Sequence, residues 1–207
     1  MSEASTNKKK KRVVILDRVI GTTTLHNNAL STNERNGEVA YLAGSTIVTY
    51  SPRKNKQRRF FRSKSATVKA LSSVQYSPDG GWIAAGERGH DPSVYIFNTN
   101  KRSKQCIELK GEHKFGVSCI RFSPNGKYIV SIGGFKQNQN LVVRTWQDEE
   151  SKVVARARLE SQVSSLCFHE TGRYFVTCGA RGNVSFWYVV TFEIYLLNPT
   201  SRSNTGI

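Results

Sequence analysis

The side chains best suited to acid–base chemistry in this sequence are a few histidines, and His113 has the most suggestive surroundings. It precedes Ser131 and Trp146, and a His, a Ser or Thr and a Trp are three of the four members of a buried polar network found in some β-sheet repeats. A general base would need a nucleophile or a carboxylate at a motif spacing, and none follows His113. We therefore interpret His113 as a structural histidine, hydrogen-bonded because a buried imidazole needs partners.

Other catalytic and metal-binding signatures are not found in the sequence. It contains no phosphate-binding glycine loop, no Gly-x-Ser-x-Gly elbow and no His-Glu-x-x-His motif. Four cysteines, Cys106, Cys119, Cys167 and Cys178, stand far apart without a zinc-ligand spacing. Each cysteine lies in an apolar run, so we predict that all four are reduced and buried. From the missing catalytic and metal-binding signatures we predict no cofactor, no metal and no enzymatic activity.

Positive charge is concentrated near the amino terminus. The formal net charge is +16, and residues 1–64 hold 14 Lys and Arg against 4 Asp and Glu. The basic residues form a leader cluster and a second segment that also carries two phenylalanines. They are Lys8, Lys9, Lys10, Lys11, Arg12, Arg53, Lys54, Lys56, Arg58, Arg59 and Arg62. Cations beside aromatics are typical of nucleic-acid-binding segments, but we favour an exposed outer strand whose aromatics face a core.

The elements that must position these residues repeat at a fixed interval. Gly80, Gly126 and Gly172 are spaced 46 residues apart. Each glycine ends a turn between two apolar strands, as in Ser-Pro-Asp-Gly and Ser-Pro-Asn-Gly, where proline and glycine supply the turn geometry. Third and fourth strands complete each unit, and units of 40–45 residues with four strands are the pattern of WD-type propeller blades.

The fold class predicted is therefore all-β: a partial WD40 β-propeller of antiparallel four-stranded blades. Three blades are clear, and residues 38–50 predict two strands of an earlier, degenerate blade. We expect a basic disordered leader over residues 1–15, a repeat domain over 16–188 and a divergent tail outside the repeat over 189–207. The expected structural network of a blade consists of His113, Ser131 and Trp146 in the second clear unit. In the last unit only Thr177 and Trp187 stand at the equivalent places. The apolar run 184–197 is too short to span a bilayer.

Some motifs are more specific than the repeat itself. They are Leu16–Gly21, Gly37–Gly44, Tyr50–Gln57, Gly111–Cys119 and Asn183–Tyr188. Together they resemble the amino-terminal part of the family of mitogen-activated protein kinase-binding protein 1 and the spindle-pole WD-repeat protein. This resemblance implies a scaffold in JNK signalling or spindle organisation. It also implies a fragment of a longer product, because the family's kinase-docking and dimerising segments lie in a carboxy-terminal region without a counterpart here.

Two functions are consistent with this sequence. The first is a non-catalytic scaffold for protein partners, located in the cytoplasm, the nucleus or at spindle poles, without a membrane or small-molecule substrate. Its contacts would come from loops at the rim of the ring, because loops on a rigid scaffold carry recognition. The candidates are Arg88, His90, Lys114, Phe135, Lys136 and Arg181. The alternative is a nucleic-acid-binding module that uses the basic segments 8–12 and 53–62.

Overall fold

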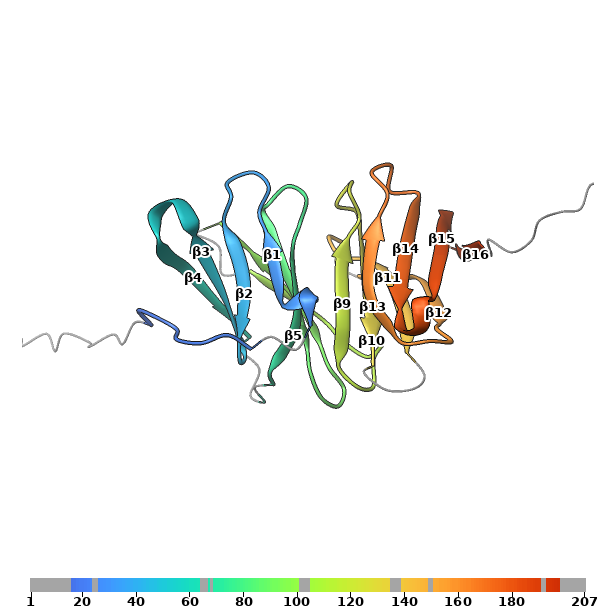
Figure 1. Ribbon diagram of the computed structural model, residues 1–207, viewed down its shortest axis with the longest axis horizontal. Coiled ribbons are helices and arrows are strands. Elements are labelled where there is room, and N and C mark those ends of the chain that lie inside the picture. Colours follow the sequence, from blue (N-terminus) through green and yellow to red (C-terminus); the bar gives the residue numbers. More distant parts are fainter. Residues whose placement is uncertain are drawn as a thin grey trace, which may run out of the picture.

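The computed structural model consists of four antiparallel sheets that stand side by side (Figure 1). It describes residues 16–23, 26–63, 67, 69–100, 105–134, 139–148, 151–190 and 193–197. Each sheet is a simple meander of four strands that neighbour one another in chain order. This is the blade architecture predicted from the repeat, and the upstream degenerate blade is a full sheet of its own.

The first sheet contains β1 (Leu30–Thr32), β2 (Val39–Ala43), β3 (Thr46–Ser51) and β4 (Lys56–Arg62). The second contains β5 (Leu71–Tyr76), β6 (Trp82–Glu87), β7 (Val94–Asn98) and β8 (Cys106–Leu109). The third contains β9 (Val117–Phe122), β10 (Tyr128–Gly133), β11 (Asn140–Thr145) and β12 (Val153–Arg158). The fourth contains β13 (Val163–Phe168), β14 (Tyr174–Gly179), β15 (Val184–Val190) and β16 (Glu193–Leu197). Three short 3-10 turns, η1 (Asn27–Ala29), η2 (Pro52–Lys54) and η3 (Ala180–Gly182), complete the described elements.

The hairpin turns form as their residues predict. Gly80, Gly126 and Gly172 have φ values of 65°, 70° and 69°, in the left-handed region that glycine enters without a Cβ penalty. In each turn the glycine N–H donates to the carbonyl three residues earlier, at Ser77, Ser123 or His169, with lengths of 2.8, 2.8 and 2.9 Å. The 46-residue spacing is therefore the spacing of equivalent tight turns.

Apolar side chains between successive sheets form three cores. The first core joins the first two sheets, for example Leu42 and Ile47 with Ile83. The second lies between the second and third sheets, and the third lies between the third and fourth. The second and third sheets each contribute to two cores, one on either face, so each of them is stable only with a neighbouring sheet on both faces.

Two sequence expectations differ from the structure. Cys119 is buried, but Cys106, Cys167 and Cys178 are exposed, because alternation along their strands turns them away from the cores. Residues 189–207 were expected outside the repeat, whereas β15 runs on to Val190 and pairs with β16 in the fourth-strand position. The run Glu193–Leu197 is rich in residues that favour strands, and it pairs with the edge of β15 that β14 leaves unpaired. Residues 198–207 lie outside the described residues, as does the expected leader over 1–15.

Candidate functional site

A polar network around His113 is buried between loop and strands of the third sheet. The Nε2 atom of His113 lies 2.7 Å from the Oγ atom of Ser131 on β10, and its Nδ1 atom lies 2.8 Å from Oδ1 of Asn140 on β11. Asn140 also donates from Nδ2 to the Glu112 carbonyl. Since Oδ1 of Asn140 can only accept, His113 carries its proton on Nδ1 and accepts the Ser131 hydroxyl at Nε2.

A hydroxyl bonded to an imidazole that a third group orients has the connectivity of a nucleophilic triad. Here, however, His113 and Ser131 are only 5% and 6% exposed. Burial lowers the pKa of His113 below its ordinary value, so the neutral ring is favoured. The arrangement therefore favours the structural role expected from the sequence, with Asn140 in the place where an acidic residue was sought.

Two neighbours fix this network. A Cβ added to Gly133 would lie 2.2 Å from Nδ1 of His113, so only glycine lets the ring approach β10. On the loop side, Glu112 accepts from Arg156 at 2.7 and 2.8 Å and lies 3.4 Å from the nearly buried Arg144. The hydrogen bonds from Arg156 lower the pKa of Glu112. The loop that carries His113 is thus fastened to both β11 and β12.

Trp146 does not belong to this network, contrary to the sequence expectation. Its indole N–H donates to the Gly126 carbonyl at 2.8 Å, because Trp146 follows the end of β11 and reaches the β9–β10 turn. Trp187 instead lies within β15 opposite Phe175, and its N–H reaches the hydroxyl of Thr177 at 2.9 Å. The two tryptophans therefore stabilise different parts of their blades.

A cluster of exposed side chains forms where the β6–β7 and β8–β9 loops meet, and we call it the rim cluster. It contains Arg88, His90, Lys114 and Phe115. His90 and Phe115 pair as an isolated antiparallel bridge, and their rings meet edge to face with centroids 4.6 Å apart. Phe115 nevertheless remains 45% exposed.

Backbone hydrogen bonds hold these two loops together. The Asp91 N–H donates to the Lys114 carbonyl at 3.1 Å, and the Gly116 N–H donates to the Gly89 carbonyl at 2.7 Å. Lys69 adds a third loop, since its Nζ atom donates to the carbonyls of His90 and Asp91 at 2.7 Å each. The rim cluster is therefore a preorganised surface on which a partner orders few additional groups.

Three other candidate loop residues cannot be placed in this cluster. Phe135 and Lys136 lie outside the described residues, and the side chain of Arg181 is not described. Sequence reasoning missed Phe115, Lys69 and Asn140. Phe115 stands beside Lys114 in the motif Gly111–Cys119, and its place after a polar loop was the available signal.

The basic segment 53–62 forms η2 and the outer strand β4. Phe61 is buried in the first core, the Arg59 guanidinium lies 4.6 Å from its ring, and Arg58 lies 3.5 Å from Glu38. The remaining cations, Arg53, Lys54, Lys56 and Arg62, are exposed. The outer-strand expectation is therefore met only in part, because Phe60 alternates to the other side of β4 and is half-buried outside the first core, and Arg59 donates to the Thr99 carbonyl and does not face water. Lys8, Lys9, Lys10, Lys11 and Arg12 lie outside the described residues.

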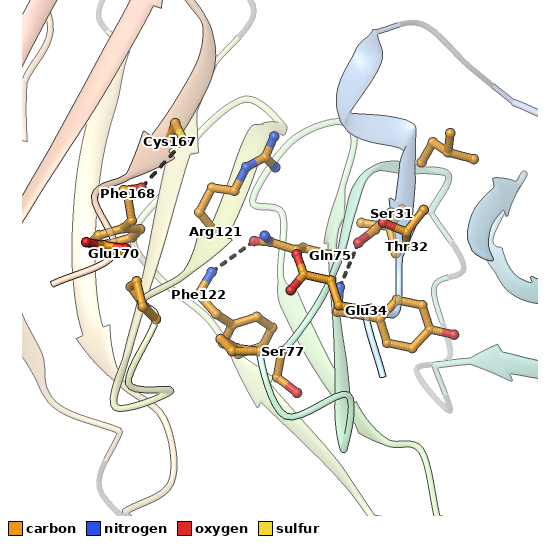
Figure 2. Close-up of a pocket in the computed structure, with 15 residues that line it drawn as sticks. Ser31, Thr32, Glu34, Gln75, Ser77, Arg121, Phe122, Cys167, Phe168 and Glu170 are labelled. Atoms are coloured by element: carbon orange, nitrogen blue, oxygen red, sulfur yellow. Dashed lines mark hydrogen bonds between the residues drawn. The ribbon is translucent and has the colours of Figure 1, made fainter. Parts of the chain in front are cut away.

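A hollow of about 530 Å³ lies where the first strands of all four sheets converge (Figure 2). Hydrogen bonds between neighbouring sheets line it: the Tyr76 N–H donates to Ser31 Oγ at 3.0 Å and the Phe122 N–H to Gln75 Oε1 at 2.9 Å. Arg121, 46 residues after Gln75, cannot accept such a bond and donates to Asn28 Oδ1 at 3.1 Å. The hollow thus belongs to the packing of the first strands around a common axis.

Among the residues that the structure describes, no three His, Cys, Asp or Glu side chains gather as metal ligands would. No helix in the same part of the chain has the length and apolar character needed to cross a bilayer.

Stacked four-stranded meanders, tight turns at a 46-residue spacing and a buried His–Ser–Asn network define a WD-repeat β-propeller protein. Residues 28–195 match the model of a family described as eukaryotic translation initiation factor eIF2A. WD repeat-containing protein 62 of Mus musculus is 40% identical over 176 residues, which cover 85% of this chain and 11% of that protein. Mitogen-activated protein kinase-binding protein 1 of Mus musculus is 39% identical over 187 residues, which cover 90% of this chain and 12% of that protein.

The chain belongs to the family that this model describes and to the WD-repeat family of these two mouse proteins. It spans 11% and 12% of their lengths. Among solved structures, a chain of the mitotic checkpoint complex is similar with a TM-score of 0.66 and 17% identity over 82% of this chain and 51% of that one. Hydrazine synthase of Kuenenia stuttgartiensis has a TM-score of 0.64 and 13% identity, covering 82% of this chain and 53% of its own. At these identities the two structures show the fold alone.

Proposed function

We propose that this chain is a non-catalytic WD-repeat scaffold that binds protein partners through the rim cluster. The observation that carries the proposal is Phe115, an aromatic ring 45% exposed on a rigid loop pair, beside His90. Aromatic anchors on preorganised loops supply much of the binding energy of protein interfaces. The flanking cations Arg88 and Lys114 favour a partner segment with acidic residues around an apolar side chain.

The relatives suggest which proteins to test first. The name of one mouse relative says that it binds a mitogen-activated protein kinase. We extend this to the present chain as a proposal: its partners belong to JNK signalling or, by the family resemblance, to the mitotic spindle. Residence in the cytoplasm, the nucleus or at spindle poles follows from the same proposal.

The test measures retention of purified JNK and of spindle-pole proteins on the immobilised 207-residue chain. Phe115→Ala and Lys114→Glu should each weaken a genuine rim contact at least ten-fold, because each removes an anchor or reverses a charge. Ile20→Ala is the matched control, since Ile20 is 92% exposed but lies far along the chain from the rim loops. Partner retention that is unchanged in both rim variants, with far-ultraviolet circular dichroism also unchanged, would refute the rim as the binding surface.

A further inference from the structure

The dipeptide Ser-Pro occurs three times in the sequence, beginning at Ser51, Ser77 and Ser123. Two of these serines belong to the repeat, because Ser77 and Ser123 begin the β5–β6 and β9–β10 turns, where they are 5% and 0% exposed. Each of these two hydroxyls accepts the backbone N–H of the residue five places later, at 2.9 Å, and so holds its turn closed. The dipeptide that begins at Ser51 has no part in these turns.

Ser51 is the last residue of β3, where the chain leaves the first sheet. The loop to β4 begins with Pro52, which has no N–H to continue the strand pairing. Ser51 is half-buried, residues 52–56 are all exposed, and the Ser51 backbone is extended at φ −101° and ψ 107°. Its hydroxyl does not cap the η2 turn that follows. Of the three serines, Ser51 is therefore the one that an enzyme can reach without opening a turn.

Positive charge surrounds Ser51. Arg53 and Lys54 follow it on the exposed loop, and the register of β3 with β4 places Lys56 directly opposite. A phosphate on this serine would carry about −1.5 to −2 charges at pH 7 and would lie among these cations. The repeat serines differ, since the third residue after each of them is the glycine of its turn. Charge therefore favours a phosphate at Ser51 in particular.

We propose that Ser51 is the acceptor of a phosphate from a proline-directed protein kinase that also selects a cation at the third residue after the serine. Such a kinase requires proline directly after the acceptor, which Pro52 supplies, and an acidic substrate cleft is complementary to Lys54. In the transfer the Ser51 oxygen attacks the γ-phosphorus of ATP, a new O–P bond forms, and the bond from that phosphorus to the bridging oxygen breaks. ADP leaves, and the hydroxyl proton passes to the catalytic aspartate of the kinase.

This site lies apart from the rim cluster. In a four-stranded antiparallel meander, the loops after the first and third strands lie at one end of the sheet and the loop after the second strand lies at the other. The sheets stand in the same sense, so the β3–β4 loop is at the end of the stack opposite to the β6–β7 loop of the rim cluster (Figure 1). Phosphorylation of Ser51 therefore leaves the rim cluster unaltered, and it can occur whether or not the rim binds a partner.

The test incubates the folded 207-residue chain with a cyclin-dependent kinase, which has this preference for proline and a cation, together with ATP and Mg²⁺. Peptide mass spectrometry then measures the phosphate on each serine over time. Ser51 should be phosphorylated at least ten-fold faster than Ser77 and Ser123, which the folded turns withhold. An unfolded chain would expose all three serines, so their ratio reports on the folded molecule. No phosphate at Ser51, or equal rates at the three serines, would overturn the proposal.

Variants separate recognition of this site from a general effect of charge. Lys54→Ala keeps the Ser-Pro pair but should slow phosphorylation at least five-fold, because it removes the cation that the acidic cleft binds. Arg62→Ala is the matched control, since Arg62 is an exposed cation at the other end of β4, and its rate should equal that of the wild type. Ser51→Ala should abolish the phosphate, and Ser51→Thr, which keeps a hydroxyl, should accept it at the same position. Equal rates for Lys54→Ala and the wild type, or equal slowing by Arg62→Ala, would also overturn the proposal.

Discussion

Replacing His113 by alanine measures what the buried network contributes to stability. The variant removes two hydrogen bonds, each with a net contribution of about 1 kcal/mol. It also leaves the Ser131 hydroxyl and the Asn140 amide without this partner, and it empties the space of an imidazole that is 5% exposed. Desolvated polar groups and a cavity together cost about 1–3 kcal/mol more, so we expect a loss of about 3–5 kcal/mol in the free energy of unfolding.

Urea unfolding followed by tryptophan fluorescence is a suitable assay, because Trp146 and Trp187 are buried in different blades. A double-mutant cycle with Ser131→Ala should give a coupling of about 1–2 kcal/mol, since without His113 the hydroxyl has lost its acceptor. His169→Ala is the control, because the exposed His169 side chain hydrogen-bonds to the neighbouring Thr171 and meets the edge of the exposed Tyr174 ring, while its backbone bonds are kept in the variant. Its cost should stay within about 0.5 kcal/mol.

The reasoning fails if His113→Ala costs less than about 1 kcal/mol or if the cycle is additive. Either result would mean that water or a rearranged loop satisfies Ser131 and Asn140 as well as the imidazole does.

Four further predictions follow from described contacts. Because the folded pKa of His113 is lowered, its contribution to stability is fully present above the unfolded value near 6.5 and declines as the pH falls through the folded pKa; urea midpoints at pH 7 and pH 5.5 should show this decline, and His113→Ala should reduce it. Gly133→Ala should lower the free energy of unfolding by at least about 2 kcal/mol, because the added Cβ clashes with His113. Gly44→Ala should lower it by about 1 kcal/mol, because there only the left-handed backbone conformation is unfavourable for alanine. Equal shifts in the thermal unfolding midpoint would contradict this prediction. Cys119 should react with a thiol reagent far more slowly than Cys106, since burial raises the pKa of its thiol, and mass spectrometry of the labelled peptides decides. Substituting Arg53, Lys54 and Lys56 by alanine should leave partner retention unchanged; salt-sensitive RNA binding by the wild type that this variant loses would instead favour the nucleic-acid alternative.

The repeat could be predicted from sequence because its signal is local. Turn chemistry at Gly80, Gly126 and Gly172 and the alternation on either side act within a dozen residues, and the structure has those hairpins. The exposure of Cys167 and Cys178 could not be predicted from such a local signal. An apolar run favours a strand, but whether a given face meets a neighbouring sheet depends on tertiary packing.

The polar network shows the same limit at single residues. Trp146 and Trp187 both stand near the end of a third strand. They are 41 residues apart, whereas equivalent turn glycines are 46 residues apart, so the two tryptophans do not occupy equivalent positions of the repeat. Trp146 therefore lies beyond its strand and bonds to a turn, whereas Trp187 lies within its strand beside Thr177. Asn140 follows a polar loop, and no local rule selects it among its neighbours as the residue that meets His113.

The basic segment acquires a structural explanation from its position in the first sheet. β4 is an outer strand, and unpaired edges of this kind invite pairing with other chains unless charge or bulges prevent it. Lys56, Arg58 and Arg62 place positive charge along that edge, and the pairing of β3 with β4 shifts register between Thr49 and Tyr50. Both features are common protections of an edge strand, so the concentration of cations between Arg53 and Arg62 does not require a nucleic acid to account for it.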